Sequence, residues 1–303
     1  MSVKSFILVS FSALALTVSA MAQDGLPYKV LGDPSGTSPY FFGPNAFPIP
    51  DMVKDTKDKV TAELSGDYFS GRLASEPDRT GSVGFAVRIP LWTDRVNLSV
   101  YGQMHEWYSD NPEVRALRGV SGKYPLTGHC SGDVYVSTDM RILDERKFVP
   151  ALTLRAALKS ASGDEYEKAR YFDAPGYHFD ICATKSFPFA GDGFLKSFKA
   201  SFNFGFLCWQ TDIGCQNDAW IVAGSLELDT AVANLSADLG GYYGREEYYD
   251  RPASLKIKLD IIPDRMVSPF LYYQHGIRHW PFDQFRAGVR FSFAPFRGAR
   301  PSL

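Results

Sequence analysis

The 303-residue sequence predicts an all-β protein, a closed antiparallel up-and-down transmembrane β-barrel of about 12 strands. Three observations predict this fold. Apolar and polar residues alternate along successive segments between residues 58 and 293, and period two is the period of a β-strand. The connections between these segments alternate between short and long. Finally, no long apolar run follows the N-terminal region, which argues against a helical membrane protein.

Residues 1–22 have the features of a secretory signal peptide. Lys4 supplies the positive charge, an apolar stretch runs from Phe6 to Val18, and Ala20-Met21-Ala22 is a small-x-small cleavage site. The apolar stretch is too short to span a membrane as a helix. We therefore expect export, cleavage before Gln23, and a location in the outer membrane of a Gram-negative bacterium.

Residues 23–57 are expected to be irregular. Gly and Pro recur throughout, and Pro48-Ile49-Pro50 interrupts any regular element. Aromatic residues cluster in the same stretch at Tyr40, Phe41, Phe42 and Phe47, which favours packing against another part of the protein. The sequence leaves open whether this segment is a plug in the barrel or a periplasmic linker.

Residues 254–261 illustrate the strand pattern of the barrel, which we place at residues 58–293. Leu255 and Ile257 fall on one face, whereas Lys256 and Lys258 fall on the other. Eleven further segments share the pattern, although residues 268–274 follow it least clearly. They are residues 60–68, 83–91, 96–104, 134–142, 152–159, 177–185, 198–206, 220–228, 233–241, 268–274 and 285–293.

The connections indicate a membrane barrel. The short ones are residues 92–94, 144–146, 189–193, 229–230 and 263–265, and the long ones are residues 109–132, 160–176, 207–219, 242–252 and 275–284. Outer-membrane barrels have short periplasmic turns and longer external loops. An even strand number returns both chain ends to the periplasm, so residues 294–303 are expected to form a periplasmic tail.

A soluble β-sandwich or calycin-like barrel is the rival fold, because its strands also alternate. A soluble barrel hides its apolar face and exposes its charges to water. Here the apolar face carries Phe, Leu and Val almost without interruption, and the polar face mixes Gly, Ser, Asn and charges as a hydrated lumen does. The membrane barrel is therefore favoured.

The last predicted strand carries a recognisable motif in Arg286, Gly288, Phe291 and Phe293. This spacing resembles the assembly signal of bacterial outer-membrane β-barrel proteins. The resemblance implies membership of that general class, recognition by the barrel-assembly machinery during biogenesis and contact with outer-membrane lipid. Such proteins often end at the final aromatic residue, whereas this chain continues from Ala294 to Leu303.

Four cysteines are present, Cys130, Cys182, Cys208 and Cys215, in a chain that we expect to reach an oxidising compartment. Cys208 and Cys215 bracket a short polar segment, so we expect a local disulfide between them. Sequence alone does not decide how Cys130 and Cys182 pair. No CxxC motif or closely spaced Cys/His set occurs, so neither a metal site nor a cofactor is predicted.

The strand parity assigns many charged residues to the lumen. The predicted lumen-lining cations are Arg88, Arg141, Arg155, Lys159, Lys199, Lys256, Lys258, Arg286 and Arg290, and the anions are Glu63, Asp67, Asp139, Asp180, Glu227, Asp238 and Asp260. Because an unpaired charge in a narrow lumen is costly, we expect these residues to pair across it. The cations of residues 254–261 and 285–293 also form part of a basic ladder suited to anions.

Three functions follow as hypotheses. The first is a narrow or gated channel for small polar or anionic solutes. The second is a non-conducting scaffold that docks an envelope protein or a surface ligand through aromatic loop tips such as Trp209. The third is an outer-membrane lipid-modifying enzyme that uses His105 or His178, both assigned inward parity. No motif places a nucleophile beside these histidines, so no catalytic residue is assigned and an enzyme is not expected. A net charge of −2 without long basic runs argues against a nucleic-acid partner.

Overall fold

The computed structural model describes residues 39–91, 94–191, 193–212, 215–244, 250–263 and 265–293. The predicted signal peptide at residues 1–22 and the predicted tail at residues 294–303 lie outside the described residues. The regular secondary structure of the described residues is almost all β-strand, with 13 strands in one sheet. No helix among the described residues is long and apolar enough to cross a membrane.

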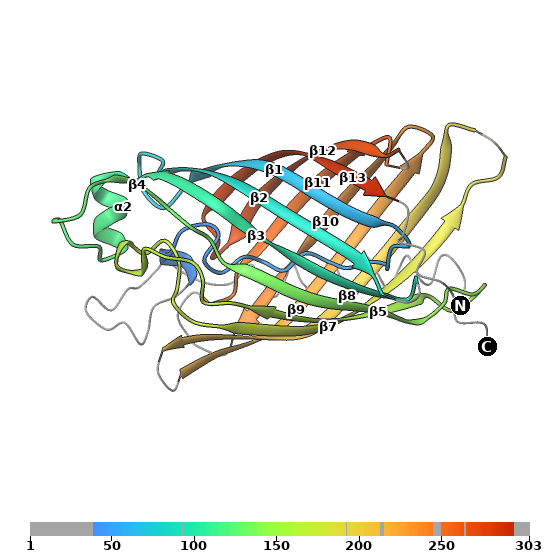
Figure 1. The fold of residues 1–303 in the computed structure, drawn as a ribbon, viewed down its shortest axis with the longest axis horizontal. Coiled ribbons are helices and arrows are strands. Elements are labelled where there is room, and N and C mark those ends of the chain that lie inside the picture. The colour runs from blue at the N-terminus through green and yellow to red at the C-terminus, as the bar shows by residue number, and fades with distance from the viewer. Residues whose placement is uncertain are drawn as a thin grey trace.

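The sheet closes on itself as a barrel (Figure 1). Twelve of the 13 strands form the antiparallel wall, because β2 pairs with β3 and completes the circle, whereas β4 pairs with β3 alone. The strands are β1 (Val60–Gly71), β2 (Arg79–Pro90), β3 (Val96–Ser109), β4 (Thr127–Cys130), β5 (Val134–Leu143), β6 (Ala151–Lys159), β7 (Gly176–Pro188), β8 (Leu195–Asp212), β9 (Cys215–Thr230), β10 (Ala233–Gly244), β11 (Ala253–Ile261), β12 (Val267–Arg278) and β13 (Phe282–Phe293). The predicted closed 12-stranded barrel is confirmed.

Alternation places apolar side chains on the outer wall and polar side chains in the lumen. On β11, Ile257 is 43% exposed on the outside, and on β13 Phe285 is 56% exposed. Polar residues of the opposite parity, such as Asn97 and Asp139, are fully buried inside. A barrel with this exposed apolar surface needs lipid around it, in agreement with the predicted membrane location.

The two ends of the barrel differ. We call the end that carries the β2–β3, β5–β6, β7–β8, β9–β10 and β11–β12 connections the turn end, and the opposite end the loop end. A short helix, α2 (Pro112–Leu117), and β4 extend from the loop end (Figure 1). Asn111 caps α2, since its side-chain oxygen accepts a 2.8 Å hydrogen bond from the backbone N–H of Val114.

The predicted loop at residues 207–219 is wrong, because β8 continues to Asp212 and β9 begins at Cys215. The predicted disulfide fails for the same reason. The strand register pairs Cys208 with Asp218, and Cys215 with Asp212. Four residues along β8 separate the two positions by roughly 13 Å, whereas disulfides require Cα atoms within about 7 Å.

A β-bulge in β3 changes the parity of its last residues. Val83 of β2 pairs with His105, but the next residue, Gly84, pairs with Gln103, so one extra residue of β3 lies between them. Beyond the bulge Glu106 and Tyr108 are buried, whereas Trp107 is 52% exposed. His105 packs against Trp107 and His129, with ring centroids 4.5 and 5.2 Å away. The predicted inward parity of His105 is therefore wrong.

Candidate functional site

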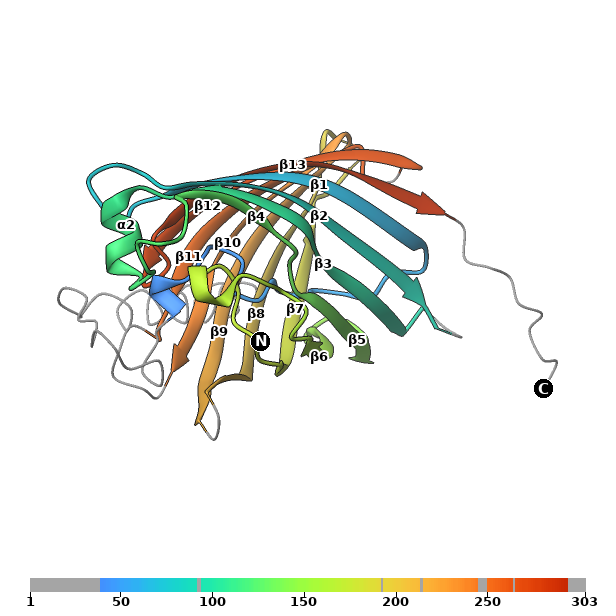
Figure 2. The same ribbon diagram turned by 60° about the vertical axis from the view of Figure 1, so that its left-hand side comes forward.

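The lumen is occupied by the protein's own chain. The residues before β1, 39–59, run inside the barrel from the loop end to the turn end, where β1 begins (Figures 1 and 2). We call them the lumen segment, and we call residues 39–47 its anchor and residues 51–57 its latch. A cavity of about 1090 Å³ remains between the segment and the wall. Thus the segment narrows the lumen without filling it.

The anchor is an aromatic cluster at the loop end. Phe42 and Phe47 are 2% and 3% exposed and pack edge to face, with centroids 5.3 Å apart. Phe172, from the β6–β7 connection, lies 5.5 Å from Phe42 and 5.6 Å from Phe47. Trp209 of β8 is buried 6.4 Å from Phe47. The prediction that Trp209 sits at an exposed loop tip is therefore wrong, because its ring helps to enclose the anchor.

Backbone and side-chain hydrogen bonds hold the anchor in register. The N–H of Gly43 donates to the carbonyl of Ala169 at 2.8 Å, and the indole N–H of Trp280 donates to the carbonyl of Pro44 at 3.3 Å. Gly43 has a steric role, since a Cβ there would lie 2.9 Å from the carbonyl oxygen of Arg170. Only a glycine allows the anchor this close to the β6–β7 connection.

A buried ion pair lies directly beside the anchor. Arg170 and Glu106 are both 0% exposed, and the guanidinium Nε donates to the carboxylate at 2.9 Å. The same carboxylate accepts from Asn45 of the anchor at 2.7 Å and from the hydroxyl of Tyr171 at 3.2 Å. Arg170 also donates to the hydroxyl of Thr80 at 2.8 Å. Multiple partners satisfy the two buried charges, as such charges require.

A second buried arginine extends this network across the loop end. Arg118 donates to Asp78 and to Asp110, each at 2.7 Å, and its side chain is fully buried. Asp110 lies 3.5 Å from Arg170, so the two arginines share one carboxylate. The network joins the β1–β2 connection, the residues after α2 and the β6–β7 connection, and it holds the loops over the anchor.

The latch is held by ion pairs with the wall. Lys54 lies 3.3 Å from Glu227 and 3.0 Å from Asp238, on β9 and β10. Asp55 accepts from Arg141 of β5 at 2.8 Å, and Asp51 pairs with Lys256 of β11. These contacts fix the latch to strands on different parts of the barrel wall.

Wall side chains also bind the latch backbone. The side chain of Asn97 accepts from the N–H of Lys57 at 2.7 Å and donates to the carbonyl of the same residue at 2.8 Å. The hydroxyl of Thr184 donates to the carbonyl of Lys54 at 3.1 Å. The barrel wall therefore binds the latch through both the side chains and the backbone of the latch.

Charges of the barrel wall shift the pKa values of two latch residues. Enclosure by the barrel would raise the pKa of Asp51, but Lys256, Arg286 and Lys258 outweigh it and lower that pKa from 3.8 to about 2. Enclosure would likewise lower the pKa of Lys54, but Asp238 and Glu227 raise it above its ordinary value. Both groups therefore stay charged around neutral pH.

The charges assigned to the lumen lie on wall strands, and each has a partner of opposite charge within 4.0 Å. The wall-to-wall pairs are Arg88–Asp139, Arg155–Asp180, Lys199–Glu227, Lys258–Asp260, Arg286–Asp67, Arg290–Glu63 and Arg290–Asp260. Lys159 pairs instead with Asp133 after β4, at 2.6 Å. Arg141, Lys256 and Asp238 pair with the latch. Sequence reasoning missed these latch partners, although the alternating charges of residues 51–59 were a usable signal.

His105 and His178, the two histidines of the enzyme hypothesis, face opposite sides of the barrel wall. His178 is inward and 2% exposed, 3.8 Å from Asp180, which also binds Arg155. The bulge turns His105 to the outside. Within the described ranges, no group of three His, Cys, Asp or Glu side chains is placed to hold a metal ion.

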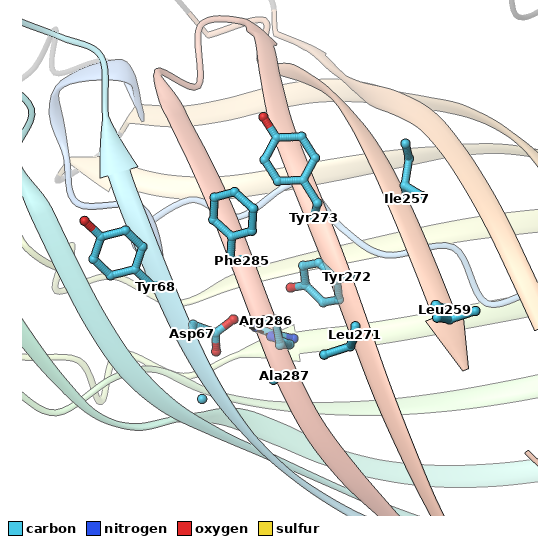
Figure 3. Close-up of a pocket in the computed structure, with 11 residues that line it drawn as sticks. Asp67, Tyr68, Ile257, Leu259, Leu271, Tyr272, Tyr273, Phe285, Arg286 and Ala287 are labelled. Carbon is cyan, nitrogen blue, oxygen red and sulfur yellow. Dashed lines mark hydrogen bonds and ion pairs between the residues drawn. The ribbon is translucent and has the colours of Figure 1, made fainter. Parts of the chain in front are cut away.

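A separate apolar hollow lies on the outer wall where β1, β13, β12 and β11 meet (Figure 3). Small residues, Gly66 and Ala287, face each other at its floor. The rings of Tyr68, Phe285 and Tyr273 lie side by side across three strands above that floor (Figure 3). Its apolar, outward position suits contact with lipid chains rather than solute.

The closed barrel, its apolar outer wall and its charged interior define an outer-membrane β-barrel protein, and known structures agree on the fold. The COG4313 outer membrane channel from Pseudomonas putida F1 is 9% identical and has a TM-score of 0.55, over 81% of this chain and 100% of that one. The transport unit of the autotransporter AIDA-I from Escherichia coli is 9% identical over 82% and 94% of the two chains, with a TM-score of 0.46. A KdgM porin in complex with disordered oligogalacturonate is 12% identical over 76% and 99%, with a TM-score of 0.43. At 9% identity the similarity to the COG4313 channel shows the fold alone.

No protein-family model matches the sequence, and no curated protein matches it. The chain is therefore placed by its fold in the general class of outer-membrane β-barrels.

Proposed function

We propose that this protein is an outer-membrane channel for small polar or anionic solutes, narrowed by its own lumen segment. The observation that carries the proposal is the cavity of about 1090 Å³ that runs beside the segment and is lined by charged wall residues. Barrels of about eight strands are usually filled by their own side chains, whereas this wider barrel keeps a charged cavity beside the segment. In this proposal the loop end faces outward and the turn end faces the periplasm.

The two halves of the segment suggest how such a channel opens. The anchor is buried among rings and hydrogen bonds, whereas the latch contacts the cavity through exposed charges. Movement of the latch widens the lumen while the anchor stays in place. The enzyme hypothesis has no such geometric support and forms no part of the proposal.

Planar bilayers provide the test. Wild-type protein should give small or infrequent conductance steps, and a variant that lacks residues 39–57 should give larger and more frequent ones. A second variant, Asp51→Asn/Lys54→Gln/Asp55→Asn, keeps the anchor and covers the case in which the deletion prevents assembly. The absence of conductance steps for all three proteins would contradict the proposed channel function.

A further inference from the structure

Four lumen cations form a compact group on two strands. We call Lys256 and Lys258 of β11, with Arg286 and Arg290 of β13, the cation ladder. Between these strands β12 contributes two rings. Lys256 Nζ and Arg286 Cζ lie 5.0 and 4.7 Å from the ring centre of Tyr272. Lys258 and Arg290 lie 5.5 and 5.6 Å from that of Phe270. A ring stabilises a cation without supplying a negative charge, so the ladder keeps its charge.

The wall alone does not neutralise the ladder. Its four cations contact three wall carboxylates, those of Glu63, Asp67 and Asp260. The fourth carboxylate comes from Asp51 of the latch, which binds Lys256. The ladder therefore has room for one carboxylate that the barrel wall does not provide.

Asp51 is placed so that a solute can compete with it. Its side chain is 64% exposed to the open lumen, whereas that of Lys256 is only 13% exposed. Both line the same cavity as the rest of the ladder. A small solute can reach the Asp51 carboxylate from the cavity without first moving the anchor.

We propose that the cation ladder binds the carboxylate of a small polar solute, which replaces Asp51 at Lys256. The inference rests on the proposed channel and names its solute class. The latch then acts as an internal competitor, since Asp51 presents the chemical group that the site recognises. Displacement of one side chain is enough, because Lys54 keeps its own contacts with Glu227 and Asp238.

Asp238 is the group that most directly opposes this inference. It is the cross-strand neighbour of Lys256 in the β10–β11 pair. In the structure it is occupied elsewhere, since it accepts from Lys54 at 3.0 Å and from the hydroxyl of Ser225. While Lys54 holds Asp238, Lys256 is available to an anion, and Asp238→Asn is expected to strengthen anion binding.

The test uses three sugars of similar size: glucuronate, glucose and glucosamine. Binding to the full-length protein in detergent is measured by saturation-transfer NMR, and passage is measured by swelling of liposomes that contain the protein. Glucuronate should bind better than glucose, and glucosamine should bind least. Asp51→Asn should strengthen glucuronate binding about two- to fivefold, since it removes one partly exposed competing ion pair. Lys256→Gln should weaken it about tenfold, because a charged hydrogen bond is lost.

Lys199→Gln is the matched control, because it removes the same charge from the lumen outside the ladder. The proposed carboxylate site is contradicted if Lys199→Gln and Lys256→Gln weaken glucuronate binding equally, or if glucose binds as well as glucuronate. The two proposals fail separately. Glucuronate binding that depends on Lys256, without any liposome swelling, supports the site and rejects the channel. Swelling that is equal for all three sugars supports the channel and rejects the site.

Discussion

The anchor and the latch are parts of one short segment, yet different forces hold them. Phe42 and Phe47 of the anchor are nearly inaccessible, and burial of each ring contributes about 1.5–3 kcal/mol. The latch is held mainly by partly exposed ion pairs, such as that of Lys54 with Glu227, each worth about 1 kcal/mol or less. The comparison teaches that packing holds the segment at the loop end and ion pairs hold it in the lumen, so the latch is the part that can move at low cost.

The buried ion pair beside the anchor should give the largest effect. Glu106→Gln leaves the fully buried guanidinium of Arg170 without its main counter-charge, which costs about 3–5 kcal/mol. We expect a fall in the unfolding temperature of about 10 °C, measured by circular dichroism in detergent.

Glu145→Gln is the control for that measurement, because Glu145 pairs with Lys185 at 2.7 Å near the turn end and is 30% exposed. A surface pair of this kind contributes about 1 kcal/mol or less. Equal losses of stability in the two variants would show that burial does not distinguish the two regions.

Removal of an anchor ring should release the segment. Phe47→Ala deletes a ring that is 3% exposed, and such truncations cost about 3–5 kcal/mol. We expect long open periods in bilayer recordings. Phe204→Ala removes the same group from the outer wall, where the ring is 44% exposed, and should leave gating unchanged. Recordings of Phe47→Ala that match those of Phe204→Ala would mean that the anchor does not restrain the segment.

The barrel could be predicted from the sequence because the alternation that marks each strand lies within that strand. Period-two alternation in the segment from Leu255 to Ile261 or from Phe285 to Phe293 reports which side of a strand faces lipid. The bulge in β3 adds a single residue that alternation does not reveal, so alternation predicts the wrong face for His105. Trp209 was misplaced for another reason. Its strand continues to Asp212, and its ring packs on Phe47, a contact between residues far apart in sequence.

The same limit applies to the site. The wall cations were predictable from strand parity, but the partners of Arg141 and Lys256 lie in an irregular segment that has no period to read. The aromatic residues of that segment predicted that it packs. Only the folded chain shows that it passes through the lumen and supplies Asp51, Lys54 and Asp55 to the wall.

A change in the latch should have a smaller effect than a change in the anchor. Lys54→Gln removes two ion pairs, and a loss of about 1 kcal/mol raises the open fraction about fivefold. Salt should act in the same direction, because the Debye length shrinks from about 10 Å at 0.1 M to about 3 Å at 1 M. Bilayer conductance, corrected for the conductivity of the solution, measures both effects.

Lys123→Gln, which removes an exposed loop charge, is the control for Lys54→Gln. The Phe47→Ala variant supplies a second comparison, since its open fraction should respond less to salt than that of the wild-type protein. If the conductance of the wild-type protein does not change with salt, the latch must be held by its backbone contacts with Asn97 and Thr184 instead.

The smallest expected effect is that of pH. The pKa of Asp51 is lowered to about 2, so the stability that it contributes is present above its ordinary value of 3.8 and is lost only as the pH falls towards 2. The pKa of Lys54 is raised, so its contribution is present below its ordinary 10.5 and is lost only at still higher pH. Conductance should therefore stay constant between about pH 4 and pH 10, as measured at fixed salt. A transition near pH 6 or 7 would assign gating to a group other than Asp51 and Lys54.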